Sequence, residues 1–458
     1  MTRFRAPTLS HYPQGTYLVE DVLKRVCGEQ GGITQSLLVS PVRYSEDLAI
    51  KSIVAQMPGY HRVLRDPHLE MQYHLSGYGV FYEEALIRLA GEAIERYSLM
   101  VAQNTLADQI RYATYREMAR EGRVLPLELL RLFSDADYER LGRGHFRGMQ
   151  RLEPDDVVGW LRCGSLFDPS QDIWAPAQML LVGYRLSRDH REVPFTPAFS
   201  TGTAAHVSVA RALQNALLEA IEIDALMLHW YTDLRAPVVE VDDTAIASLT
   251  PDLFGAHCRH EVLALNIRVL EEVEAHALAV ALIHKQRERP YIVLGAQGHL
   301  DPRRGVYRGL METIAIAFLG IYGPLFMPEE YLVSTQGSVF TDLDRNVGYF
   351  ADPADADTKR AVLDRMCGGH QALSTLPNFE TGDAEHDTAR LIRQLAAVSE
   401  YGLFLDVTPP ETRPLGWHVV RTFLPELVTM CVPGVPYSHH PRMQRYGGIT
   451  NEYPHPLP

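Results

Sequence analysis

Two pairs of glutamates form the most informative chemical pattern in the chain. Glu92 and Glu95 make up the first pair, and Glu219 and Glu222 the second, each with the spacing i, i+3. On a helix this spacing places both carboxylates on one face, close enough to repel each other. Buried carboxylates are costly unless they are neutralised, and Mg²⁺ prefers oxygen ligands supplied jointly by carboxylates, water and phosphate. The four acids therefore predict a magnesium–nucleotide site.

Solvated glutamates on a surface helix are the alternative interpretation. Apolar residues that flank the two pairs weigh against it: Ala93, Ile94, Leu217, Leu218, Ala220 and Ile221. They favour acids at the rim of a buried core. The sequence contains neither GxxxxGK[ST] nor GxGxxG after a strand, so the P-loop and Rossmann modes of phosphate binding do not apply.

The acid pairs belong to a helical pattern that occurs twice. The stretch from Ala85 to Met100 recurs 127 residues later, and eight of its sixteen positions are identical. The pattern predicts one helix over about Glu83 to Met100 and a related helix around Ala212 to Met227. Two such helices would face each other across a cation. Arg88 and Arg96 have Asn215 and Ile223 as mates, so the positive charge is expected on the first helix.

The elements between these helices indicate the fold class. Strands and helices interleave without a clean linker, which predicts one large α/β body with mixed sheets and packed helices, built on an internal pseudo-two-fold repeat. Residues 107–158 are expected to form a charge-rich helical insertion, residues 178–183 a strand, and residues 304–320 a helix.

Composition limits the function classes. The net charge of −14 argues against a protein that holds nucleic acid through its overall field. Five cysteines without a CxxC pair fit a reducing, cytoplasmic location. The N-terminus lacks the apolar core of a signal peptide, and the longest apolar run, from Ile314 to Met327, is too short to span a bilayer. That run is expected to be the end of a buried helix, and no membrane association is predicted.

Four motifs in order resemble the signatures of the YcaO family. They are Ser76-Gly77-Tyr78-Gly79 with Glu92–Ser98, Ser200–Ala205 with Glu219–Asp224, Gly298–Pro302 with Leu310 and Glu312, and the tail Asn451–Pro458. The resemblance covers roughly residues 30 to 458 and implies an N-terminal extension over 1–30 and a YcaO-like catalytic domain over 31–458. The tail, 451–458, is similar to the PxPxP end of the azoline-forming branch, which makes thiazole/oxazole-modified peptides of the streptolysin and microcin type.

The resemblance also implies roles for individual residues. Glu92, Glu95, Glu219 and Glu222 fall on the acid positions that bind magnesium in the family. The residues expected to contact ATP are Ser76, Arg88, Arg96, Asn215 and Arg308. The chain departs from the family pattern at Arg88, Asn215, Ile223 and Tyr78, where Ser, Gln, Arg and Lys are usual.

The implied reaction needs a base as well as a nucleotide. ATP phosphorylates the backbone amide oxygen after a Cys, Ser or Thr side chain of a ribosomal precursor peptide has attacked the carbonyl carbon, and loss of phosphate leaves a thiazoline or oxazoline. A stiff polyproline-type tail could position the carboxylate of Pro458 reproducibly, so Pro458 and His455 are the expected catalytic residues.

Two other interpretations remain open. The enzyme could use sulfide or an amine and form thioamides or amidines, or the chain could be a non-catalytic scaffold of a peptide-modifying complex. The family resemblance further implies a ThiF-like partner that binds the leader of the precursor, a flavin-dependent azoline dehydrogenase, and a homodimer.

Overall fold

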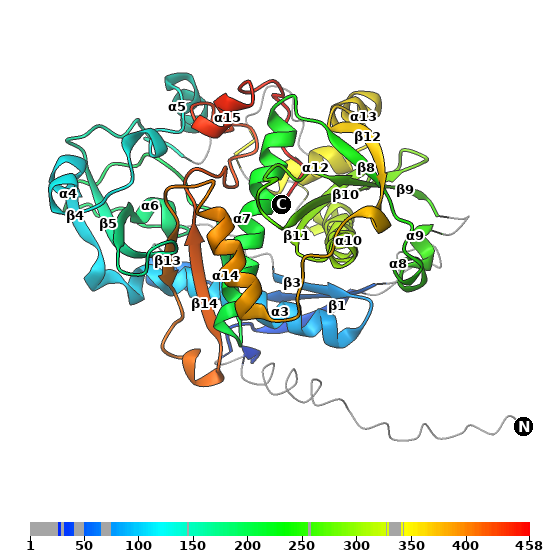
Figure 1. The fold of residues 1–458 in the computed structure, drawn as a ribbon, viewed down its shortest axis with the longest axis horizontal. Coiled ribbons are helices and arrows are strands. Elements are labelled where there is room, and N and C mark those ends of the chain that lie inside the picture. The colour runs from blue at the N-terminus through cyan, green and yellow to red at the C-terminus, as the bar shows by residue number, and fades with distance from the viewer. Residues whose placement is uncertain are drawn as a thin grey trace, which may run out of the picture.

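The computed structural model describes residues 26–28, 32–40, 50–65, 75–143, 146–254, 258–326, 328, 340–341 and 343–458. Most of the expected N-terminal extension, residues 1–30, lies outside these ranges. The structure contains three sheets, and one long helix, α7 (Val209–Tyr231), stands near the middle of the molecule and packs between two of them (Figure 1). Alternating strands and mixed sheets with packed helices confirm the predicted α/β class.

A three-stranded antiparallel sheet carries the first glutamate helix. Its strands, in spatial order, are β1 (Ser36–Ser40), β2 (Lys51–Gln56) and β3 (Leu75–Gly79). Helix α3 (Tyr82–Thr105) packs on β3 and β2, and its buried residues include Leu89, Ala93 and Ile94. The apolar residues beside the acids therefore form core contacts, as the sequence predicted. The short helix α2 (Tyr60–Leu64) lies against α3.

A five-stranded sheet packs against α7 and is covered by a second long helix. Its order is β11 (Ile292–His299), β10 (His276–His284), β9 (His260–Asn266), β8 (Ala236–Glu240) and β12 (Cys367–Ala372), with only the β8–β12 pair parallel. Helix α10 (Pro302–Phe326) packs on β11 and β10. Ile314, Ile316 and Ala317 are buried, so the first part of the long apolar run is core helix as predicted, whereas Leu325 near its end is 62% exposed.

A six-stranded sheet completes the core. The path is β4 (Arg111–Thr114), β5 (Val157–Ser165), β13 (Leu403–Asp406), β14 (His418–Phe423) and β7 (Thr203–His206), with β6 (Asp172–Pro176) paired to β5. Helix α7 packs on β14 and β7 as well as on β11, and α14 (Ala384–Leu395) lies along it (Figure 1). This position between two sheets explains why α7 is almost entirely buried.

Two sequence-based expectations need correction. Residues 107–158 contain the helices α4 (Tyr115–Glu121) and α5 (Asp135–Gly142), but they also supply β4, which joins the six-stranded sheet. Residues 178–183 do not form a strand, because β6 ends at Pro176 and helix α6 (Ala177–Leu180) begins there. Proline cannot donate to a strand ladder, and Ala, Gln, Met and Leu are good helix formers.

The remaining elements are short helices and 3₁₀ turns. They are α8 (Thr244–Leu249), α9 (Pro251–Phe254), α12 (Arg345–Ala351), α13 (Ala356–Asp364) and α15 (Pro441–Arg445), with 3₁₀ turns at Ala107–Gln109, Leu127–Leu129, Leu373–Thr375 and Arg413–Leu415. In the parts of the chain that the structure covers, no helix combines the length and apolarity required to cross a bilayer.

Candidate functional site

The first acid of each pair is held by the strand that precedes its helix. The Ser76 backbone N–H donates to Glu92 Oε2 at 2.9 Å, and the Gly202 N–H donates to Glu219 Oε2 at 3.0 Å. Both acids are thus fixed by the backbone near the start of the strand–helix unit. The twofold sequence pattern therefore extends to this three-dimensional contact.

A third strand–helix unit, β11–α10, reaches the same acids. The Gly298 N–H donates to Glu222 Oε2 at 2.7 Å, and Glu312 of α10 accepts a hydrogen bond from the Ala296 backbone. Glu312 follows Ala296 at the separation that joins Ser76 to Glu92, 16 residues. Glu312 lies in the third sequence motif, but it is not among the residues that the sequence predicted for the site. The signal that could have found it is this repeated strand-to-glutamate spacing.

Burial and mutual repulsion shift the protonation of these acids. Burial, opposed by the charge of Arg96, raises the pKa of Glu219 to about 7, and burial with the nearby Glu219 charge raises that of Glu312 to about 8. The pKa values of Glu95 and Glu222 are also raised well above the usual range, again mainly by burial. The carboxylates would therefore gain from a cation placed among them.

Fewer cations than carboxylates surround the cluster. Arg96 Nη2 lies 3.8 Å from Glu92 Oε1, and the fully buried Arg421 of β14 acts on Glu95 and Glu219 while it donates to Thr203 Oγ1 at 3.0 Å. Burial lowers the pKa of Arg421 to about 10. With Arg88, whose charge reaches Glu312, three guanidinium groups of the described residues face five carboxylates. Four of these carboxylates keep their protons to a higher pH than usual, and a divalent cation would take the place of those protons.

The acids do not form a closed cage. Among the residues with described positions, no three His, Cys, Asp or Glu side chains converge as a ready-made metal site. Mg²⁺ usually takes only one or two carboxylates and completes its shell with water and substrate phosphates. The pairs on α3 and α7 match that requirement better than they would match a structural metal.

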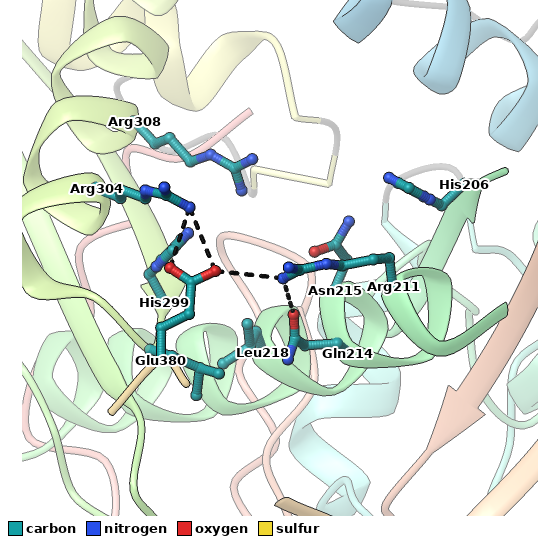
Figure 2. Close-up of a pocket in the computed structure, with 10 residues that line it drawn as sticks. His206, Arg211, Gln214, Asn215, Leu218, His299, Arg304, Arg308 and Glu380 are labelled. Carbon is teal, nitrogen blue, oxygen red and sulfur yellow. Dashed lines mark hydrogen bonds and ion pairs between the residues drawn. The ribbon is translucent and has the colours of Figure 1, made fainter. Parts of the chain in front are cut away.

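A basic pocket of about 200 Å³ is lined by residues of α7 and α10 (Figure 2). The residues that line it are His206, Arg211, Gln214, Asn215, Leu218, His299, Leu300, Arg304, Arg308 and Glu380. Glu380 accepts from Arg304 Nη1 at 3.0 Å and from Arg211 Nη1 at 3.4 Å. Burial, together with the charge of nearby arginines, lowers the pKa of His206 and lowers that of His299 to about 3, so both imidazoles are neutral near pH 7. Three arginines against one carboxylate leave the lining of this pocket with a net positive charge.

The pocket adjoins the glutamates through α7 and β11. Asn215 and Leu218 line it, and each lies four residues, about one helical turn, before an acid: Asn215 before Glu219, and Leu218 before Glu222. A Cβ at Gly298 would meet Leu218 O at 2.2 Å and Glu222 Cβ at 3.3 Å, which shows how closely β11 crosses the helix. A ligand with several phosphates would therefore find arginines at one end and carboxylates at the other.

The structure divides the predicted ATP contacts into two groups. Arg308 and Asn215 line the basic pocket, whereas Ser76 and Arg96 lie at the acid pairs. Arg88 bonds to Glu84 Oε1 at 2.8 Å, lies 5.1 Å from the centre of the Tyr78 ring, and is close enough to lower the pKa of Arg308.

The expectation that positive charge resides on the first helix alone is wrong. Arg211 belongs to α7, and Arg304 and Arg308 to α10, and all three line the basic pocket. The sequence repeat does not reveal these three arginines, because Arg211 precedes the repeated stretch and α10 lies outside it.

The C-terminal tail is buried between α7 and α12. The Asn346 side chain donates to the carbonyls of His455 at 2.6 Å and Leu457 at 2.7 Å, and Trp230 Nε1 donates to Tyr453 O at 2.9 Å. His455 is fully buried, and its Nε2 lies 3.1 Å from Cys431 O. Burial lowers the pKa of His455 to about 4.

These surroundings differ from those expected of a catalytic base. His455 is shielded from solvent and lies against the Tyr231 ring. These contacts fit a residue that anchors the tail. Pro458 is partly exposed at the end of this buried segment. The hydrogen bonds of this segment run to Asn346 and Cys431.

A family model described as a YcaO cyclodehydratase that binds ATP and Mg²⁺ matches residues 76–428. The chain therefore belongs to the YcaO family. The family's ligands, ATP and Mg²⁺, are those that the sequence predicted. No curated protein matches the chain in sequence.

Solved structures support the same fold at low sequence identity. A heterocyclase in complex with substrate and cofactor has a TM-score of 0.70 and 18% identity over 96% of this chain. The chain spans only 56% of the length of that protein. The YcaO protein from Methanopyrus kandleri, bound with AMPPCP and Mg²⁺, has a TM-score of 0.59 and 16% identity, with 97% and 96% of the two chains covered.

An assembled complex is also among the similar structures. A chain of the E. coli microcin synthetase McbBCD with pro-MccB17 bound has a TM-score of 0.60 and 12% identity, with coverage of 94% of this chain and 98% of that one. At these identities the three structures show the shared fold and nothing more.

Proposed function

We propose that the chain is an ATP-dependent cyclodehydratase that converts Cys, Ser or Thr residues of a ribosomal precursor peptide to thiazolines or oxazolines. One observation carries the proposal: a buried cluster of carboxylates with raised pKa values adjoins an arginine-lined pocket. A magnesium–polyphosphate ligand is complementary to both parts, because the metal neutralises the acids and the phosphates neutralise the arginines.

The proposed roles follow the two halves of the site. Glu92, Glu95, Glu219 and Glu222 hold magnesium, and we add Glu312 to this set because its pKa responds to the same acids. The proposed contacts of the nucleotide are Ser76, Arg88, Arg96, Asn215 and Arg308. MgATP supplies the phosphoryl group that turns the amide oxygen into a leaving group. The protein's contribution is to position the peptide carbonyl and to balance the developing charge.

The tail is the proposed source of proton transfer. The side chain of the peptide must lose a proton when it attacks the carbonyl carbon, and the amide nitrogen must lose another when phosphate leaves. We propose the carboxylate of Pro458, where that residue is terminal, as the acceptor. The buried anchors at Asn346 and Trp230 support the proposal, because they limit the freedom of the segment that carries it.

The proposed partners complete the reaction. We propose a precursor peptide as substrate, a ThiF-like protein that binds its leader, a flavin-dependent dehydrogenase that oxidises azolines, and a homodimeric core. The McbBCD complex, which contains several proteins and has pro-MccB17 bound, is the observation that favours partner proteins.

Calorimetric titration with MgATP tests the nucleotide half of the proposal. Wild-type protein should bind MgATP, and Glu92→Gln should weaken binding about tenfold or more, because one carboxylate ligand of magnesium is lost. Glu128→Gln, on the exposed 3₁₀ turn at Leu127–Leu129, is the control. Absence of MgATP binding by the wild type would contradict every enzymatic interpretation and would leave the scaffold.

Mass spectrometry tests the product. With ATP, the ThiF-like partner and a candidate precursor, cyclodehydration removes one water per ring. Replacement of oxygen by sulfur, or addition of an amine with loss of water, would instead support thioamide or amidine formation.

A further inference from the structure

A carboxylate of the protein itself occupies the centre of the arginine pocket. Glu380 bridges Arg304 and Arg211, which come from different helices, at 3.0 Å and 3.4 Å (Figure 2). Its side chain is only 11% exposed. Two of the three arginines in the pocket are therefore already paired with an anion, and Arg308 is the third.

The backbone that carries Glu380 is anchored on both of its sides. The Phe379 N–H donates to Leu300 O at 2.9 Å, and the Phe379 ring stacks on His276 with ring centres 4.9 Å apart. On the following side, the Thr381 N–H and hydroxyl both donate to Asp387, at 3.1 Å and 2.9 Å. These contacts hold the segment against the core. Glu380 can leave the arginines through rotation of its side chain while the backbone stays in place.

We propose that Glu380 is a built-in competitor of the nucleotide: its carboxylate occupies a phosphate position between Arg211 and Arg304 and must be displaced by a phosphoryl group of the ligand. The inference rests on the proposed function, because it takes this pocket as the phosphate end of the nucleotide site. Glu380 would thereby determine which anions bind.

Charge explains the expected selectivity. With neutral imidazoles at His206 and His299, the pocket holds three guanidinium groups and one carboxylate. An anion with a single charge gains little by replacing Glu380, because it restores only the contacts that the carboxylate already makes. A triphosphate carries several charges, so it can reach Arg308 as well as the two arginines that Glu380 releases. The pocket should therefore prefer polyphosphates over inorganic phosphate.

The test measures binding of inorganic triphosphate and of MgATP to the full chain by calorimetry. In Glu380→Gln the size of the side chain is kept and its charge is removed, so both ligands should bind about fivefold more tightly. Glu385→Gln, at an exposed position in the first turn of α14, removes the same charge outside the pocket. This control should leave both affinities within about twofold of the wild type.

A double-mutant cycle tests whether the effect of Glu380 on binding acts through Arg211. Arg211→Met should weaken triphosphate binding, and in that background Glu380→Gln should change the affinity by less than it does in the wild type. Equal or weaker binding by Glu380→Gln would overturn the inference and would show that Glu380 only holds the arginines in position. Failure of the wild type to bind MgATP would instead contradict the proposed function. Unchanged circular dichroism and melting temperature establish that each variant is folded.

Discussion

Gly298 donates its backbone N–H to the Glu222 carboxylate at 2.7 Å, which joins strand β11 to the second acid pair. A side chain at Gly298 has no room, because its Cβ would lie 2.2 Å from Leu218 O. Helix and strand are thus fixed at a separation that lets one backbone donor hold one carboxylate. The third strand–helix unit therefore helps to build the acid cluster instead of only covering it.

Gly298→Ala should separate β11 from α7. The obstructing atom is a backbone oxygen, which cannot rotate away, so the free energy of unfolding should fall by about 2 kcal/mol. Urea denaturation measures this loss. Gly142→Ala is a suitable control, because a Cβ there meets nothing within 4 Å, and at the last position of α5 it should leave stability unchanged or raise it slightly. An unchanged unfolding midpoint in Gly298→Ala would contradict the close approach.

The acid cluster should make the protein free of ligand less stable as the pH rises. The pKa values of Glu219 and Glu312, ordinarily 4.5, are raised to about 7 and about 8, mainly by burial. Above pH 4.5 the unfolded chain has released these protons, while the folded protein keeps them up to pH 7 to 8. The folded state therefore binds more protons in this window, and the free energy of unfolding falls as the pH increases through it.

Urea denaturation at a series of pH values, with EDTA present, measures this decline. The double variant Glu219→Gln/Glu312→Gln should flatten the dependence, because the two groups no longer titrate. Mg²⁺ with ADP should restore stability at the alkaline end, since the metal takes the place of the lost protons. Stability that rises steadily across the window would contradict the raised pKa values.

A buried ion pair should couple the C-terminal region to α7. Arg442 donates to Asp224 through Nε at 2.7 Å and Nη2 at 2.8 Å, and the Val428 N–H donates to Asp224 Oδ1 at 2.8 Å. Loss of one partner leaves an unpaired buried charge, so Arg442→Met should lower the free energy of unfolding by about 3 kcal/mol. Asp224→Asn/Arg442→Met should recover part of that loss. Additive single losses in the double-mutant cycle would show that the pair is not coupled.

Asn346 should keep the tail ordered without contributing to nucleotide binding. Its side-chain amide donates to the carbonyls of His455 and Leu457, so Asn346→Asp replaces a donor with a carboxylate that repels both. Hydrogen exchange of residues 451–458 should accelerate about tenfold, and MgATP affinity should stay within about twofold. Product formation should fall if Pro458 is the base.

Asn104→Asp provides the matching control, because it makes the same chemical change at an exposed position near the end of α3. Unchanged exchange of the tail in Asn346→Asp would contradict the anchoring role. A loss of MgATP affinity in that variant would show that the tail and the nucleotide site are not independent.

Local spacing determined much of this site. The i, i+3 spacing placed Glu92 with Glu95 and Glu219 with Glu222 on helix faces, and their apolar neighbours indicated burial, because a helix repeats every 3.6 residues whatever lies around it. The repeat and the motifs also predicted the two long helices, the fold class and the family. These features depend on residues that lie close together in the sequence.

Contacts between distant segments were decided only by the tertiary structure. Glu312 joins the acids because β11 crosses α7 beside α10, and Glu380 meets Arg211 across 169 residues of sequence. His455 is a buried anchor because α7 and α12 enclose the tail. Periodicity states which side chains share a face, but it carries no information on which faces meet. The packing of two sheets against α7 determines that, and it placed an internal carboxylate in the pocket beside the acid pairs.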